Sequence, residues 1–220
     1  MTAPLPRSFY ARDTRIVARD LLGAHLVRVL PDGTRLSGII VETEAYRPAD
    51  QASHAHRGRT ERNAAMFLAP GTAYVYFTYG MYYCLNIVTE EEGIPAAVLI
   101  RALEPLEGIA VMQKFRDMRP NHNRPIPPHD LCRGPARLCM ALAIDGQLNA
   151  YDMFQRESVL FVERGATLLD SQVGTSARIG VFGDDTALAA EWRWFVAENA
   201  FVSHTSRSHR SDSKRTKPTS

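Results

Sequence analysis

The chain has 220 residues, of which 45% are hydrophobic and 23% charged, and its formal net charge is +2. This length and composition suit one folded domain with a substantial buried core. No stretch approaches the ~18–20 apolar residues that cross a bilayer, and the N-terminal residues lack the apolar segment of a secretory signal. We therefore expect a folded intracellular protein that does not enter membranes.

Cysteine and histidine usage argues against a disulfide framework and against a metal site. Cys84, Cys132 and Cys139 are an odd number and form no C-x-x-C pair, which favours a reducing compartment. His54 and His56 could bind a metal, but a zinc site needs three or four ligands. The glycine-rich nucleotide-binding motifs are also missing. We expect no metal and no cofactor.

The basic residues are unevenly placed along the chain. Residues 204–220 hold five basic residues against one acidic residue, whereas residues 1–203 contain Lys114 as their single lysine. A segment of this composition cannot form a core. We expect a single domain over residues 1–203 and a flexible basic tail over 204–220. The tail either attracts a polyanion or is a solvated terminus without a function.

The N-terminal third predicts one helix and one hairpin. Asp13 precedes the apolar positions of residues 16–22, and Gly23 follows them, which indicates a capped helix. Residues 25–30 and 36–46 are rich in strand formers and flank a Pro-Asp-Gly turn, so we expect a β-hairpin there.

The rest of the chain predicts further strands with a few helices. We expect a second hairpin from residues 72–79 and 81–88 around Gly80, a buried strand at 97–103, helices at 105–118 and 135–144, a proline-rich loop at 120–132, and late strands at 177–182 and 192–196. Since no alternating βαβ pattern is present, the expected fold is mixed α/β (α+β). We predict a single domain with a curved, mostly antiparallel sheet, hairpins and flanking helices.

Two carboxylates and a phenol share one face of the strand at residues 36–46. Strand alternation places Glu42, Glu44 and Tyr46 together. A solvated sheet face is one interpretation. The following segment, however, gathers histidines and arginines: His54, His56, Arg57, Arg59 and Arg62. We expect these groups to converge at one end of the strand.

Tyrosines are concentrated in the second hairpin. Five of the eight tyrosines of the chain fall within residues 74–83. Core packing explains some of them, because tyrosine favours strands. It does not explain Tyr79, which stands beside Gly80 and Met81 where a hairpin tip meets solvent. A protruding aromatic side chain is one means of separating stacked bases.

Six ordered motifs together resemble the alkyladenine (3-methyladenine) DNA glycosylases of the mammalian type. They are residues 40–46, 66–67 with 70–72, 74–76 with 79–82, Asn86, 101–108, and 134–135 with 138–139. The resemblance extends from about residue 11 to residue 202. It implies a DNA repair enzyme that flips a damaged purine out of double-stranded DNA and hydrolyses its N-glycosidic bond, leaving an abasic site.

The resemblance also implies a role for each matching residue. Glu44 would be the general base for the attacking water, and Arg101 would help to hold that water. The flipped base would lie among Tyr46, His54 and Tyr76, with Asn86 clashing with the exocyclic amino group of normal guanine. Met66 and Cys84 would line the surroundings of the pocket, and Tyr79 with Met81 would enter the duplex. His56 remains an alternative to His54.

Three further expectations concern partners. A non-catalytic nucleic-acid-binding module is the alternative function, but it would not need Glu42 and Glu44 facing a polyanion. We expect a monomer that acts in the bacterial cytoplasm on the nucleoid, or in the nucleus of a eukaryote. The DNA-facing surface should be locally basic, through Arg57, Arg59, Arg62 and the region 116–137.

Overall fold

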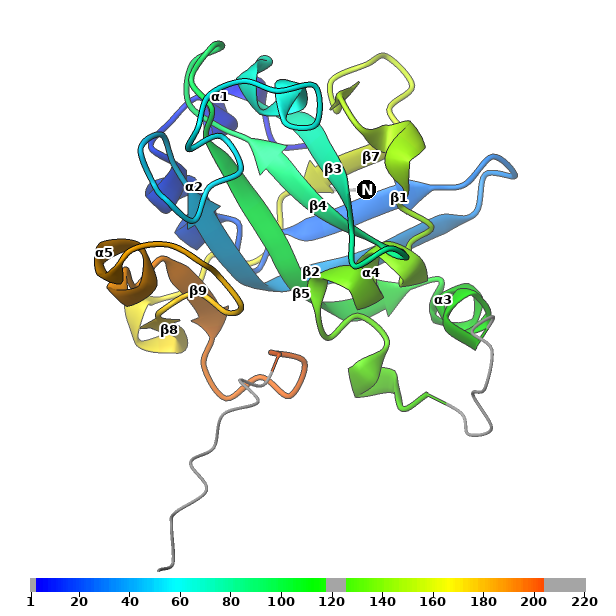
Figure 1. The fold of residues 1–220 in the computed structure, drawn as a ribbon. Coiled ribbons are helices and arrows are strands. Elements are labelled where there is room, and N and C mark those ends of the chain that lie inside the picture. Colours follow the sequence, from blue (N-terminus) through cyan, green and yellow to red (C-terminus); the bar gives the residue numbers. More distant parts are fainter. Residues whose placement is uncertain (1–2, 118–125, 204–220) are drawn as a thin grey trace, which may run out of the picture.

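A computed structural model describes residues 3–117 and 126–203, which form a mixed α/β domain (Figure 1). The expected tail at 204–220 and part of the proline-rich loop lie outside the described residues. The helices are α1 (Arg7–Tyr10), α2 (Thr14–Asp20), α3 (Ile109–Asp117), α4 (Pro135–Ala141) and α5 (Asp185–Ala189). The strands are β1 (His25–Val29), β2 (Arg35–Tyr46), β3 (Thr72–Thr78), β4 (Tyr82–Val88), β5 (Ala97–Glu107), β6 (Tyr151–Asp152), β7 (Leu160–Glu163), β8 (Val173–Ser176) and β9 (Arg193–Val196).

All described strands belong to one nine-stranded antiparallel sheet. Its main path runs β6-β3-β4-β5-β2-β1-β7, and β9 pairs with both β2 and β8. The expected fold class is therefore confirmed. Both expected hairpins are present, as β1 with β2 and as β3 with β4.

Strand β2 is the element that connects the sheet to the site. Its first half pairs with β1 and its residues 42–44 pair with β9, while β5 runs along its other edge. The register with β5 shifts on either side of Glu42, which marks a β-bulge. A bulge bends a strand and redirects its side chains, and it is common beside active sites.

The helix expected after Asp13 is α2, and the Asp13 side chain accepts a hydrogen bond from the backbone N–H of Arg15. The predicted start of the next helix is wrong. Residues 105–107 continue β5, where Pro105 lies opposite Gly38 of β2. A Cβ on Gly38 would stand 2.9 Å from the Leu103 Cβ, so glycine permits this close strand pairing. Helix α3 begins only after Gly108, which has a φ of +75°.

The strand predicted at residues 177–182 is also wrong, because these residues form a loop after β8. Two contacts draw this loop out of the sheet. The buried Arg178 side chain pairs with Asp50, and the backbone N–H of Ile179 donates to Glu44. Gly180 then turns the chain with a φ of +69°.

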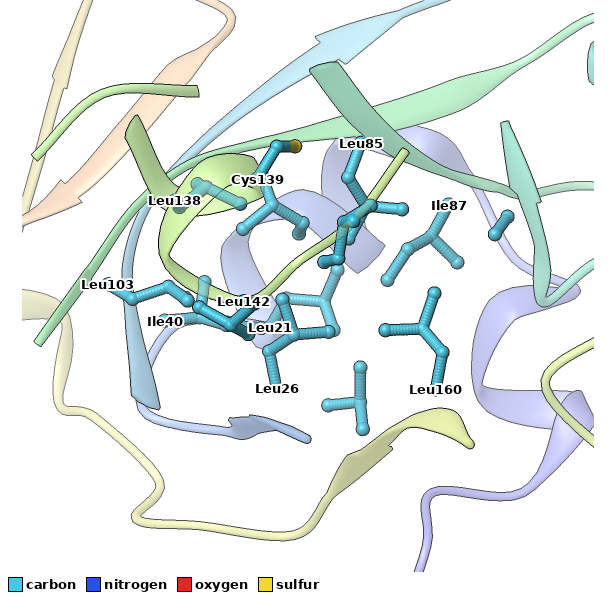
Figure 2. Close-up of a cluster of buried hydrophobic side chains, with 14 of the residues drawn as sticks. Leu21, Leu26, Ile40, Leu85, Ile87, Leu103, Leu138, Cys139, Leu142 and Leu160 are labelled. Atoms are coloured by element: carbon cyan, nitrogen blue, oxygen red, sulfur yellow. The ribbon is translucent and has the colours of Figure 1, made fainter. Parts of the chain in front are cut away.

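The main core lies between the sheet and the helices α2 and α4. Figure 2 shows Leu138, Cys139 and Leu142 from α4 and the residue after it, packed towards Leu103 and Leu85 of the sheet. All five side chains are at most 1% exposed. A smaller buried cluster, which includes Met66 and Tyr74, lies beside β3 and continues towards the pocket described below.

Candidate active site

A pocket of about 290 Å³ opens beside the ends of β2 and β3. Its walls come from residues 46–86 and from the much later segment 180–182: Tyr46, Gln51, Ala52, Ser53, His54, Met66, Tyr74, Tyr76 and Asn86, together with Gly180, Val181 and Phe182. Five of the side chains expected at the site therefore line one cavity. They are Tyr46, His54, Met66, Tyr76 and Asn86.

Glu44 lies directly behind Tyr46 and is 0% exposed. The Tyr46 hydroxyl donates to Glu44 Oε2 over 2.7 Å, and the Ile179 N–H donates to Oε1 over 2.7 Å. Arg101 Nη1 stands 3.2 Å from the same Oε1. An ionised carboxylate offers about four acceptor positions. These three donors occupy three of the positions and leave one on Oε2.

Arg101 joins the two buried carboxylates of β2. Its Nε donates to Glu42 Oε1 over 3.0 Å while its Nη1 faces Glu44. This contact shows that Glu42 and Glu44 share a face, as strand alternation predicts. The interpretation of that face as solvated is wrong, because both side chains are 0% exposed.

Glu42 is enclosed by donors from the C-terminal part of the domain. Arg193 Nε donates to Oε1 over 2.7 Å, and Ser203 donates from its N–H to Oε2 over 2.7 Å and from its hydroxyl to Oε1 over 2.8 Å. Burial alone would raise the pKa of Glu42, but the positive charges of Arg101 and Arg193 outweigh it and lower that pKa. Glu42 therefore serves as a fixed anion that holds Arg101 in place.

Arg178 supports the other side of Tyr46. Its guanidinium lies 4.8 Å from the Tyr46 ring centroid and 5.1 Å from that of Trp192, and it forms a buried ion pair with Asp50. Burial next to the Glu44 carboxylate raises the pKa of Tyr46 well above its usual value. Tyr46 therefore keeps its proton and remains a donor to Glu44. Sequence reasoning missed Arg178 and Asp50, since a buried ion pair leaves no periodic signal.

His54 forms the histidine wall of the pocket. Its ring lies 4.5 Å from the Tyr76 ring at 82°, and its Nδ1 is 2.9 Å from the Tyr74 hydroxyl. Partial burial and the positive charge of Arg62 lower the pKa of His54, so the ring is neutral at pH 7. Asn63, another residue that sequence reasoning missed, fixes this loop by donating to the His54 carbonyl over 2.9 Å.

Both His54 and the alternative histidine, His56, are exposed, but only His54 lines the pocket. Asn86 and Met66 are nearly fully buried at the pocket wall, with 4% and 2% exposure, and Asn86 donates to the Tyr74 carbonyl over 3.2 Å. Cys84 does not line the pocket. It lies opposite Tyr76 in the sheet ladder, and burial raises the pKa of its thiol, so Cys84 supports the Tyr76 wall as a neutral group.

The tip of the β3–β4 hairpin is strongly exposed. Tyr79 is 82% exposed and Met81 is 65% exposed. Tyr79 and Gly80 have positive φ values of +50° and +69° in the turn between the paired residues Thr78 and Tyr82. Asparagine, aspartate or glycine usually occupies the first of these positions. Tyrosine is therefore an unusual residue for this position.

The expected basic surface is partly present. Arg57, Arg59 and Arg62 are exposed in the loop that carries His54. The expectation for the region 116–137 is wrong at Arg116. That side chain is 3% exposed and donates to the backbone carbonyls of Asp130 and Leu131, so it cannot face DNA.

Neither a metal-binding cluster nor a membrane-spanning helix occurs among the described residues. Across residues 3–117 and 126–203, no group of three or more His, Cys, Asp or Glu is placed to hold a metal ion. No helix in the same part of the chain is long and apolar enough to cross a membrane.

An aromatic pocket backed by an arginine-held carboxylate, beside an exposed aromatic hairpin tip, is the arrangement of an enzyme that acts on a nucleic-acid base. The chain belongs to the methylpurine-DNA glycosylase family, whose model matches residues 8–200. It is therefore a DNA glycosylase, an enzyme of DNA repair whose substrate is DNA. This finding removes the alternative of a non-catalytic binding module.

Relatives that carry the name "Putative 3-methyladenine DNA glycosylase" match almost the whole chain. One from Herpetosiphon aurantiacus is 41% identical over 99% of this chain and 96% of its own. One from Salinibacter ruber is 46% identical over 93% and 98%, respectively. One from Methanocella arvoryzae is 47% identical over 90% of this chain and 95% of its own.

Proposed function

We propose that the enzyme removes methylated purines, such as 3-methyladenine, from double-stranded DNA by turning the damaged nucleotide into the pocket and hydrolysing its N-glycosidic bond. One observation carries this proposal. Glu44 does not itself line the pocket, but the Tyr46 ring lines it while the Tyr46 hydroxyl binds Glu44, so a base stacked on that ring would be one side chain away from the carboxylate. The relatives' shared name supports the choice of substrate.

Extrusion of the nucleotide is needed because the N-glycosidic bond is inaccessible inside the base stack. Unstacking and unpairing cost a few kcal/mol, a general property of glycosylases. We propose that Tyr79, with Met81 beside it, fills the gap that the flipped nucleotide leaves in the base stack, since both side chains project from the hairpin. Stacking on Tyr46, Tyr76 and His54 returns ~1–3 kcal/mol for each aromatic contact.

Selectivity follows from charge and shape. A purine methylated at N3 or N7 carries a positive charge in the nucleotide, and aromatic faces attract a cation by ~1–2 kcal/mol in a partly desolvated site. The neutral His54 avoids repulsion of that charge. We assign to Asn86 the exclusion of normal guanine, because its buried amide is fixed by the Tyr74 carbonyl at the pocket wall.

The reaction needs a water molecule on the sugar side of the pocket. In the proposed step, Glu44 accepts a proton from this water as its oxygen bonds to C1′, and the bond between C1′ and the base nitrogen breaks with its electron pair moving to the base. The negative charge of Glu44 also stabilises the developing sugar cation. Arg101 orients the carboxylate through its contact with Oε1.

We further propose that the product is an intact abasic site. Strand cleavage by a glycosylase requires an amine that forms a Schiff base. Among the described residues that line the pocket there is no lysine, and Lys114 is exposed on α3. We also propose a monomer that acts on chromosomal DNA, in a bacterial cytoplasm or a eukaryotic nucleus, with residues 204–220 adding non-specific DNA affinity through their charge.

The test is excision from a duplex that contains one methylated purine, followed by alkaline cleavage of the abasic sites formed. The wild-type enzyme should release the base. Glu44→Gln keeps the size of the side chain but removes the base, so we expect the rate to fall about a hundredfold or more. Binding to an abasic-analogue duplex should persist in this variant. Full activity of Glu44→Gln would contradict the assignment.

A further inference from the structure

Phe182 is a strongly exposed aromatic residue at the edge of the pocket. The side chain lines the pocket, yet it is 86% exposed to solvent. Single exposed apolar side chains are common on protein surfaces. An aromatic ring at the wall of a binding pocket is different, because an occupant of the pocket would cover it. The surface that Phe182 offers is thus available to a bound base.

The loop that carries Phe182 is fixed at both of its ends. On one side the Ile179 N–H donates to Glu44 over 2.7 Å. On the other side Asp184 accepts from the Gln51 side chain over 2.8 Å and from the Ala187 N–H over 2.8 Å. Residues 180–183 are therefore held between the carboxylate and the loop that carries His54, and Figure 1 shows that loop (residues 47–63, cyan) near α5.

Two glycines flank the ring within these anchors. A Cβ on Gly183 would stand 2.9 Å from the Ala187 Cβ and 3.3 Å from the Gln51 Cβ, so glycine lets the loop approach both neighbours. Gly180 has a φ of +69° with open space where a Cβ would point. The backbone before Phe182 is therefore conformationally permissive, whereas the backbone after it is tightly packed.

We propose that Phe182 is a further base-contacting residue, which packs against the methylated purine in the pocket and covers its outer part. This inference rests on the proposed function, since it names a contact for the same substrate. The ring would meet the cationic base with an electron-rich face, as Tyr46 and Tyr76 do. Both the base and the ring would lose contact with water on binding. Loss of one such aromatic contact weakens binding about five- to 150-fold.

The experiment measures the affinity of Phe182→Ala and Phe182→Tyr for free 3-methyladenine, whose uncharged ring reports stacking alone, together with single-turnover excision from a methylated duplex, in which the base is cationic. We expect Phe182→Ala to weaken binding of the free base at least about fivefold and to slow excision at subsaturating enzyme. Phe182→Tyr, which keeps the ring, should retain both. Leu169→Ala is the matched control, because Leu169 is 69% exposed and does not line the pocket.

The outcomes separate this inference from the proposed function. If the wild-type enzyme neither binds the free base nor excises it, the proposed function fails. If the wild-type enzyme does both and Phe182→Ala binds the free base equally well, Phe182 does not contact the base. A loss of duplex binding without a loss of free-base binding would also overturn the inference, since it would place Phe182 against the DNA strand. Unchanged thermal unfolding of Phe182→Ala would exclude a folding defect.

Discussion

The hydroxyl of Tyr46 donates a hydrogen bond to Oε2 of Glu44 over 2.7 Å, so the wall of the pocket and the buried carboxylate form one unit. A hydrogen bond to a charged group contributes ~1.5–3 kcal/mol. Any displacement of the Tyr46 ring therefore also disturbs the carboxylate. This coupling gives a direct way to separate the holding of the base from the activation of water.

Tyr46→Phe keeps the aromatic face and removes this hydrogen bond. We expect single-turnover excision to slow about ten- to a hundredfold, because the carboxylate loses one donor that orients it. Affinity for a lesion-containing duplex should change less than threefold, which corresponds to ~0.6 kcal/mol of binding free energy. Tyr46→Ala should lose both properties. Equal losses of binding and rate in Tyr46→Phe would show that the hydroxyl does not act through Glu44.

Glu42→Gln tests the fixed anion behind Arg101. Removing one partner of a buried ion pair costs about 3–5 kcal/mol, so the free energy of unfolding should fall by about that amount at pH 7. The pKa of Glu42 is lowered from 4.5, so its stabilising effect is present above pH 4.5 and is lost as the pH falls through the lowered value. The difference from the wild type should thus shrink below pH 4.5.

Urea unfolding at a series of pH values measures this effect. Glu92→Gln is the matched control, because Glu92 is exposed and its substitution should leave stability nearly unchanged at every pH. A stability difference between Glu42→Gln and the wild type that does not vary with pH would contradict the assignment. Glu42→Gln is not a neutral control for catalysis, because the loss of Glu42 also releases Arg101 from one of the two carboxylates that Arg101 contacts.

His54 should give the wild-type enzyme an acid-sensitive step. Its pKa lies below 6.5, so the ring is neutral above pH 6.5 and gains a charge as the pH falls through the lowered pKa. The charged ring would stand next to Arg62 and repel a cationic base. We expect excision of a methylated purine to decrease in this acidic range, and His54→Gln to be slower by about tenfold without that decrease.

His56→Gln is the matched control for that measurement, because His56 is exposed outside the pocket. The pH–rate profile of this variant should follow the wild type. If His56→Gln removed the acid-sensitive step instead, His56 would be the histidine that meets the base. Thermal unfolding at each pH would separate loss of activity from acid unfolding.

Tyr79→Ala tests the exposed hairpin tip. Loss of the ring should slow excision from a fully paired duplex by about tenfold or more, because nothing then fills the gap in the stack. Excision from a mismatched or unpaired context should change much less, since unstacking costs less there. Similar losses in both contexts would mean that Tyr79 only stabilises the hairpin, which thermal unfolding of the variant would also show.

Because none of the described residues that line the pocket is a lysine, we expect no Schiff-base intermediate to form. Borohydride treatment during turnover should therefore trap no protein–DNA adduct, whereas a bifunctional glycosylase run alongside should give one. Lys114→Arg should excise the base at the wild-type rate, because Lys114 lies exposed on α3. A trapped adduct, or an inactive Lys114→Arg, would refute the proposal of an intact abasic product.

The sequence predicted those features that repeat along the chain. Alternation in β2 placed Glu42 with Glu44, and the turn around Gly80 placed Tyr79 at a hairpin tip. Contacts between distant segments could not be read in this way. Arg178 pairs with Asp50, 128 residues away, and a buried arginine has no local pattern that distinguishes it from a surface one.

The same limit explains why the predictions for two elements and the interpretation of one strand face are wrong. Pro105 is typical of a helix start, but pairing with Gly38 keeps it in β5. Residues 177–182 have the composition of a strand, but the Ile179 N–H donates to the Glu44 side chain and the segment forms a loop. The interpretation of the Glu42 and Glu44 face as solvated is also wrong, because Arg101 lies against both and neither is exposed.

The contacts of Glu42 with Arg193 and Ser203 have a consequence for biosynthesis. These two hydrogen-bond partners lie 151 and 161 residues after Glu42 in the chain. These partners are synthesised long after Glu42, and contacts between residues so far apart in sequence form late and slowly during folding. A nascent chain that lacks β9 therefore has the hairpin and much of the pocket wall, but it has a poorly held Arg101. DNA repair activity should thus emerge only after synthesis of the domain is nearly complete.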